Sequence, residues 1–98
     1  MNDLDPVIHA TTRLRIMTAL DALDRADKMS FNALAEGLGL TPGNLSVHLS
    51  KLEVAGYVAV EKTYRGRKPA TYVAMTAGGR AAFERYLADL SALIGDRS

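Results

Sequence analysis

Few side chains in this sequence could carry out covalent chemistry or hold a metal ion. Cysteine is absent, and the two histidines are His9 and His48, which excludes disulfides, thiolate metal sites and cysteine nucleophiles. Asp5 and His9 are spaced as i and i+4, but two ligands are too few for a metal site, and a helix cap with a surface pair explains them. Ser46 and His48 diverge on a helix and cannot form a hydrolytic pair. We expect no enzyme activity, cofactor or metal.

Positive charge is concentrated in one short stretch of the sequence. Twelve basic and eleven acidic residues give a net charge of +1, yet no acid interrupts residues 62–80. That stretch contains Lys62, Arg65, Arg67, Lys68 and Arg80. Crowding of like charges at residues 62–68 is unfavourable in the free protein and is relieved by a polyanion. The Arg65-Gly66-Arg67 triplet is also similar to minor-groove hooks, in which glycine permits close approach and arginines seek narrow A·T-rich tracts.

Turn signals divide the 98 residues into short periodic segments that would position these side chains. Asp5-Pro6 combines an N-cap residue with a proline at the first helical position, which predicts a helix over residues 5–28. Its apolar spacing slips near residues 9–12. The slip indicates either a kink or a break between two helices.

Residues 30–56 carry the spacing of a helix-turn-helix. Ala35, Gly39 and Leu45 occupy relative positions one, five and eleven. The small residue lets the second helix approach, the glycine turns the chain, and the leucine locks the second helix across the first. Ser30 can cap the first helix of this pair, and Thr41-Pro42 starts the second, which is expected over residues 41–55.

Projection of residues 41–55 at 100° per residue separates a core stripe from an outward face. Leu45, Leu49 and Leu52 fall on the core side. The outward face carries short side chains that would let the helix enter a major groove, which is about 12 Å wide. It comprises Gly43, Asn44, Ser46, Val47, Ser50 and Lys51. Thr41, Gly43 and Ser46 are expected to position the helix on phosphate, aided by the free N–H groups of its N-terminus. Asn44 is the expected base contact, because a carboxamide pairs bidentately with adenine. His48 falls at the border, where a structural role is favoured over a phosphate contact.

Two β-rich segments, residues 57–62 and 71–76, predict a hairpin over residues 57–76. A final helix is expected over residues 77–95, with apolar residues at the spacing of a coiled-coil seam. This apolar face is wider than one small core can cover, which predicts a homodimer. The expected dimer residues are Val7, Ile8, Phe83, Tyr86, Leu87, Leu90, Leu93 and Ile94. The alternative, in which the last helix folds back onto its own domain, stays open.

Residues 45–58, LSVHLSKLEVAGYV, resemble a stretch of small bacterial and archaeal winged-helix transcriptional regulators related to the MarR and ArsR families. The resemblance extends to residues 13–16, 66–69 and 75–80 and covers nearly the whole chain. It implies a mainly α fold with one small β-hairpin, in the order α-α-α-β-β-α. It also implies a dimeric, sequence-specific double-stranded DNA-binding protein, usually a repressor and often responsive to a small-molecule effector, whose identity the sequence does not give. The lack of cysteine departs from ArsR metal sensors, and the short chain leaves little room for the ligand cleft of long MarR proteins.

We therefore expect one domain over residues 1–98, a homodimeric transcriptional regulator that needs no cofactor. The helix over residues 41–55 would enter the major groove, and a wing over residues 62–70, with Lys62, Arg65, Gly66, Arg67 and Lys68, would follow the minor groove and backbone. The alternative is a winged helix that binds another protein through Tyr57, Tyr64 and Tyr72. No apolar run approaches the ~20 residues needed to span a bilayer, and the acidic N-terminus is unlike a signal peptide, so we expect a cytoplasmic protein.

Overall fold

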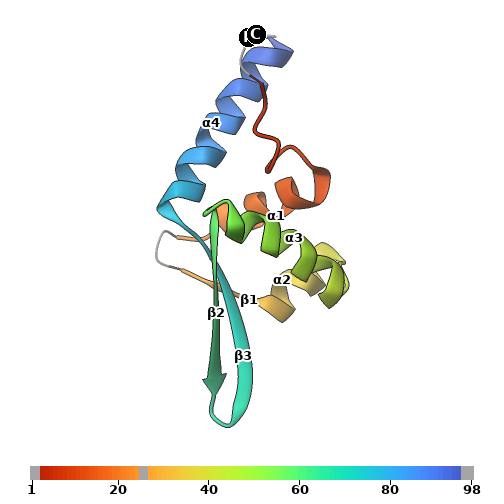
Figure 1. The fold of residues 1–98 in the computed structure, drawn as a ribbon, viewed down its shortest axis with the longest axis vertical. Coiled ribbons are helices and arrows are strands. Elements are labelled where there is room, and N and C mark those ends of the chain that lie inside the picture. The colour runs from red at the N-terminus through yellow and green to blue at the C-terminus, as the bar shows by residue number, and fades with distance from the viewer. Residues whose placement is uncertain (1–2, 25–26, 96–98) are drawn as a thin grey trace.

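The computed structural model describes residues 3–24 and 27–95, which form four helices and a three-stranded antiparallel sheet. In chain order the elements are α1 (Thr11–Asp21), β1 (Met29–Ser30), α2 (Phe31–Leu38), α3 (Pro42–Val54), β2 (Val58–Arg65), β3 (Lys68–Met75) and α4 (Ala77–Ile94) (Figure 1). The molecule measures 52 × 26 × 25 Å, with α4 at one end of the long axis and the tip of the β2–β3 hairpin at the other. The expected winged-helix fold is confirmed.

The first helix is shorter than the predicted range of residues 5–28. Asp5 caps a turn rather than a helix: its Oδ1 accepts from the Val7 N–H at 2.9 Å, and its carbonyl accepts from the His9 N–H at 2.7 Å. Ala10 is extended, with φ −145° and ψ 132°, and α1 begins at the next residue. The slip in apolar spacing therefore marks a break. Residues 3–10 form a separate segment, here called the N-terminal arm.

The sheet contains one strand more than expected. β1 is two residues long, and its Met29 and Ser30 pair with Val73 and Tyr72 of β3. A strand this short has no readable alternation, which is why the sequence pattern did not predict it. The Ser30 hydroxyl also accepts from the Ala33 N–H at 3.0 Å, so one residue ends β1 and caps α2.

The hairpin is paired to its tip. Residues 63–70, expected as a loop, are strand except for Gly66 and Arg67, and the final pair joins Arg65 to Lys68. A two-residue loop with glycine first suits a type II′ turn, which needs a positive φ at that position; Gly66 has φ +67°. The wing is therefore a narrow two-stranded ribbon with cationic residues near its tip.

One apolar core joins the helices to the base of the sheet. Its members from α1, α3 and the hairpin include Ile16, Met17, Leu20, Leu45, Leu49, Leu52, Val58 and Val73. Among the described residues, no polar or charged side chain is buried. In the same residues, no helix is both long and apolar enough to cross a membrane.

The N-terminal arm and α4 contribute to this same core. Ile8, Phe83 and Tyr86, all expected at the dimer interface, are only 0%, 3% and 2% exposed within one chain. The core covers these three side chains, so they offer no surface to a second copy. Their expected role is corrected accordingly: they attach α4 and the arm to the rest of the domain, and the Tyr86 hydroxyl also contacts His9 Nδ1 at 2.9 Å.

The start of α4 passes against the chain that enters β2. Thr76 caps α4 by accepting from the Gly79 N–H at 2.9 Å and donates to the Gly56 carbonyl at 2.6 Å. At Gly79 a Cβ would lie 2.7 Å from Tyr57 C and 2.9 Å from its Cα, and closer still to its carbonyl oxygen. Only glycine fits this backbone contact.

We expect Gly79→Ala to lower the free energy of unfolding by about 1–3 kcal/mol, because the added methyl overpacks a backbone contact. Urea titration followed by circular dichroism measures this. Gly78→Ala is the matched control: its Cβ would lie 3.6 Å from the Gly56 oxygen, an ordinary contact, so the better helix propensity of alanine should leave stability unchanged or raise it by up to about 1 kcal/mol. Equal effects of the two substitutions would contradict the close approach at Gly79.

Candidate nucleic-acid interface

The beginning of α3 is fixed by local chemistry. Gly39 ends α2 in the left-handed conformation, with φ 68°, and Thr41 caps α3 by accepting from the Asn44 N–H at 3.1 Å. Pro42 stands at the first helical position, where a missing N–H costs nothing. The turn and the start of the helix therefore follow from the sequence, as expected for a helix-turn-helix.

The buried and exposed residues of α3 match the core stripe and the outward face expected from the helical projection. Leu45, Leu49 and Leu52 are 0%, 3% and 0% exposed. The residues expected to face DNA are all exposed, namely Thr41, Gly43, Asn44, Ser46, Val47, Ser50 and Lys51. Burial of the three leucines orients α3 so that a row of small, mostly uncharged side chains faces solvent.

The cations of the wing are exposed and carry no carboxylate partner. All five residues expected to contact DNA from the wing, Lys62, Arg65, Gly66, Arg67 and Lys68, are exposed. In residues 3–24 and 27–95 the two ion pairs are Lys28–Glu61 at 2.8 Å and Arg80–Asp21 at 3.0 Å. Arg80, the last cation of the basic stretch, therefore serves the attachment of α4 to α1 and is not part of the wing surface.

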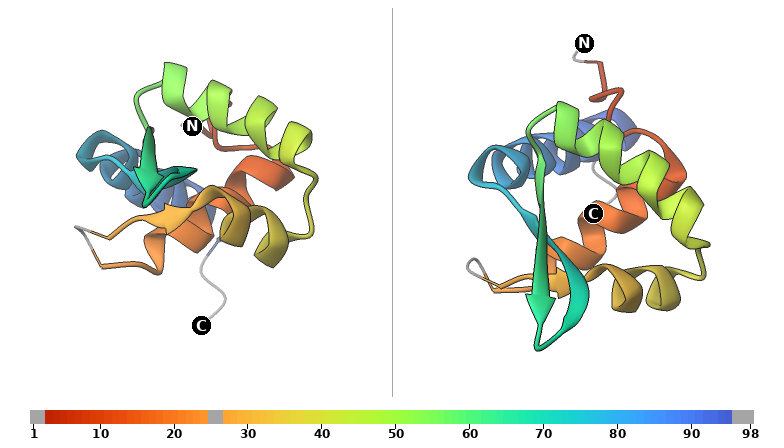
Figure 2. Two further views of the ribbon diagram at one scale, coloured as in Figure 1. Left: turned by 90° about the horizontal axis from the view of Figure 1, so that it is seen from below. Right: turned by 60° about the horizontal axis from the view of Figure 1, so that its bottom comes forward.

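Two hollows join the wing to the helix-turn-helix. The first, of about 270 Å³, lies between α3 and the hairpin, with Ser46 and Ser50 on one side and Lys62 on the other. The second, of about 400 Å³, lies between the wing and the start of α2, where Arg65 and Lys68 meet Asn32 among other residues. In the view of Figure 2, right, which brings the wing end of the molecule forward, α3 and the hairpin both lie in front of α4. We call this continuous area the α3–wing surface.

The place of Asn32 beside the wing was not foreseen from the sequence. β1 carries the start of α2 to the edge of β3, and this brings Asn32 to the hollow that Arg65 and Lys68 line. The one local signal was Ser30 as an N-cap; the strand pairing that places it depends on residues more than forty positions away.

His48 connects α3 to the N-terminal arm through Arg13. The Arg13 Nε donates to the Val7 carbonyl at 2.6 Å, and its Nη1 lies 3.2 Å from His48 Nδ1. A guanidinium can only donate, so Nδ1 accepts and the neutral ring carries its proton on Nε2. Partial burial, and then the charges of Arg13 and Lys51, lower the pKa of His48 below 6.5. These contacts match the structural role favoured for this residue.

The tyrosines expected to serve a protein partner are mostly occupied. The Tyr57 hydroxyl donates to Asp5 Oδ2 at 2.5 Å, and this hydrogen bond raises the pKa of Tyr57. The Tyr72 ring lies 4.8 Å from Lys28 Nζ in a cation–π contact. Tyr64 on the wing, at 72% exposure, is the one of the three that is largely free.

A helix-turn-helix followed by a cationic hairpin defines a winged-helix domain, and comparison with known proteins agrees. The chain belongs to a family of winged helix DNA-binding domains, whose model matches residues 12–94. The expected resemblance to winged-helix transcriptional regulators is thereby confirmed.

Individual relatives extend this similarity. The uncharacterized protein MJ0432 of Methanocaldococcus jannaschii is 34% identical over 84 residues, which cover 86% of this chain and 88% of that protein. The structure of a transcriptional regulator homologue from Pyrococcus horikoshii is 36% identical with a TM-score of 0.81, over 90% of this chain and 84% of that one. The repressor CouR, solved bound to a 23-mer DNA duplex, is 23% identical with a TM-score of 0.67, over 83% of this chain and 54% of its own. CouR therefore shares the fold.

The lowered pKa of His48 predicts a loss of stability on acidification. The unfolded chain protonates this ring near pH 6.5, whereas the folded chain does so only at lower pH. The free energy of unfolding is therefore not reduced by His48 above about pH 6.5, and it falls as the pH drops through that value. We expect the free energy of unfolding in urea to be lower at pH 5.5 than at pH 7.5. The difference should be smaller in His48→Gln. Asn32→Ala, an exposed substitution that removes no titratable group, is the control and should keep the wild-type difference; identical pH dependence in His48→Gln and wild type would contradict the assignment.

Proposed function

We propose that the protein is a homodimeric, sequence-specific transcriptional regulator of double-stranded DNA, acting as a repressor. The helix over residues 41–55 would enter the major groove, and the wing over residues 62–70 would follow the minor groove and backbone. The observation that carries the proposal is the α3–wing surface, on which the small, mostly uncharged side chains of α3 lie beside wing cations that have no carboxylate partner. The family to which the chain belongs supports the DNA partner.

The first turn of α3 suits a DNA backbone. Pro42 has no N–H, while the N–H groups of Asn44 and Leu45 are taken by Thr41 Oγ1 and the Thr41 carbonyl. Gly43 then has the first-turn N–H outside these bonds, with open space around its Cα. A helix N-terminus of this kind favours a phosphate. Asn44, next to it and exposed, would read an adenine edge.

The tip of the wing suits the minor groove. The tip consists of the ends of β2 and β3 joined by the two-residue turn at Gly66-Arg67. Arg65 and Arg67 are exposed there, and the tip contains no acidic residue. Arginine side chains seek the negative potential of a narrow A·T-rich minor groove. Lys62 and Lys68 would then rest on phosphates, which position the protein and carry no sequence information.

An apolar strip on α4 supports the homodimer. Leu87, Leu93 and Ile94 are 45%, 52% and 62% exposed, and the half-buried Val7 and Leu90 complete the set that remains from the expected interface. Apolar side chains grouped on one helix are covered when two copies pack about a two-fold axis. Such a pair would place the two α3 helices in successive major grooves, roughly 34 Å apart.

Selection of bound sequences from random duplex DNA tests the proposal. We expect an imperfect palindrome with half-sites one helical turn apart and A·T-rich flanks under the wings. Asn44→Ala should lose about 1–3 kcal/mol of preference at one base pair per half-site. Glu84→Ala, at an exposed position of α4 outside the α3–wing surface, should leave base preference unaltered. An unpaired motif would contradict the dimer, and an unchanged motif in Asn44→Ala would remove that residue from the interface.

The dependence of affinity on salt tests the wing separately. If each protomer makes about four or five phosphate contacts, log K should fall against log[salt] with a slope near −7 to −9. Arg67→Ala should make the slope less steep by about one per protomer and leave the selected major-groove sequence unchanged. Arg85→Ala, exposed on α4 far from the wing, is the control and should keep the slope. Weak binding that is insensitive to salt would favour the protein-partner alternative.

A further inference from the structure

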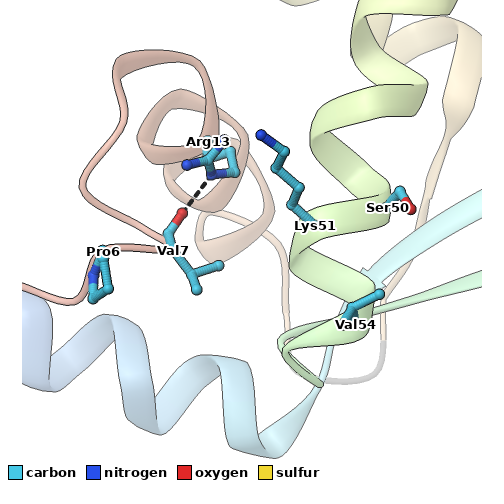
Figure 3. A pocket seen from close by; sticks show the side chains of 6 residues that line it. All are labelled: Pro6, Val7, Arg13, Ser50, Lys51 and Val54. Atoms are coloured by element: carbon cyan, nitrogen blue, oxygen red, sulfur yellow. Dashed lines mark hydrogen bonds between the residues drawn. The ribbon is translucent and has the colours of Figure 1, made fainter.

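An apolar hollow lies beside α3, apart from the two that join it to the wing. It is an open hollow of about 340 Å³, at the lower end of the range of about 300–1,000 Å³ typical of small-ligand pockets. Its lining comes from the N-terminal arm, α1 and α3, and consists of Pro6, Val7, Arg13, Ser50, Lys51 and Val54 (Figure 3). Val54 is 87% exposed although it is aliphatic. Its outward position gives the hollow an apolar wall.

The edge of the hollow is cationic. In Figure 3 the Arg13 and Lys51 side chains lie at the same edge of the hollow, with Val7 on the N-terminal arm and Val54 on α3. No lining residue is acidic, and in the described part of the chain neither ion pair involves Arg13 or Lys51. Both charges are close enough to His48 to lower its pKa. Two cations that meet without an acid favour an anion between them.

Arg13 is held in place and keeps free donors. Its Nε and Nη1 contact the Val7 carbonyl and His48 Nδ1, and a guanidinium has five N–H groups in all. The remaining N–H groups can therefore bind an anion without breaking these contacts. A donor that is already oriented costs less conformational entropy when it binds a ligand.

We propose that this hollow binds a linear aliphatic carboxylate of medium chain length. Its carboxylate would lie between Arg13 and Lys51, and its chain would cover Pro6, Val7 and Val54. The lining contains no aromatic side chain, so stacking gives an aromatic ring no advantage over an alkyl chain. The charge of the edge selects an acid over a neutral lipid or alcohol.

Occupation of this site would oppose DNA binding, an effect that rests on the proposed function. Ser50 and Lys51 line the hollow and also belong to the outward face of α3. A carboxylate that holds the Lys51 ammonium removes it from a DNA phosphate. By linkage, DNA must then weaken the binding of the carboxylate by the same factor.

Calorimetric titration of the whole chain with octanoate, and with octan-1-ol as the uncharged counterpart, tests the site without DNA. We expect one octanoate per chain, bound about tenfold more tightly than octan-1-ol, since the alcohol can still accept a hydrogen bond from the cations but lacks the negative charge that strengthens it. Hexanoate should bind more weakly, by up to about fourfold per methylene removed. Lys51→Met should lower octanoate affinity about tenfold and leave octan-1-ol unaffected. The control Lys62→Met removes a charge from the wing and should bind octanoate as wild type does.

The outcomes separate the site from the proposed function. Absence of octanoate binding, as when a second copy covers the hollow, or equal affinity in Lys51→Met and wild type, would overturn the site. A gel-shift titration without octanoate tests DNA binding independently, so its failure would leave the site standing. With both ligands, saturating octanoate should weaken wild-type DNA affinity severalfold and Lys51→Met affinity less; an unchanged wild-type affinity would overturn the coupling.

Discussion

The packing of three α3 leucines against α1 and α2 is the constraint on which the rest of the structure depends. Leu45, Leu49 and Leu52 lie in a core that contains no polar or charged side chain among the described residues. Burial of one such side chain contributes about 1.5–3 kcal/mol. Because all three must face inward, the rotation of α3 is fixed, and Asn44 and Ser46 face outward as a result.

Polar contacts place the elements that this small core cannot hold alone. Ser30, Thr41 and Thr76 cap α2, α3 and α4, while the N-terminal arm is held by Tyr57 on Asp5 and by Arg13 on Val7. Arg13 also reaches His48, so the arm and α3 share one guanidinium. The proposed dimer surface, the proposed carboxylate site and the outward face of α3 therefore meet within a few side chains, which gives a physical route for one to influence another.

The fold also sorts the cations of the sequence by role. Lys28 and Arg80 pair with Glu61 and Asp21, and these pairs join the sheet edge and α4 to their neighbours. The cations between residues 62 and 68 stand on a two-stranded ribbon that brings no acid to its tip. A basic run in the sequence thus separates into a structural residue and a surface available to a polyanion.

Features set by neighbouring residues could be predicted from the sequence: the Ser30 and Thr41 caps, the turn at Gly39, the leucine stripe of α3, and hence the side of α3 that carries Asn44. Their physics is local, because a cap or a helical face depends on residues within about one or two turns. The tertiary structure alone decided three further features. It broke the first helix at Ala10, paired β1 with β3, and buried Ile8, Phe83 and Tyr86 in one chain. Each of these depends on which distant segment covers an apolar face, and periodicity shows that a face must be covered without showing by what.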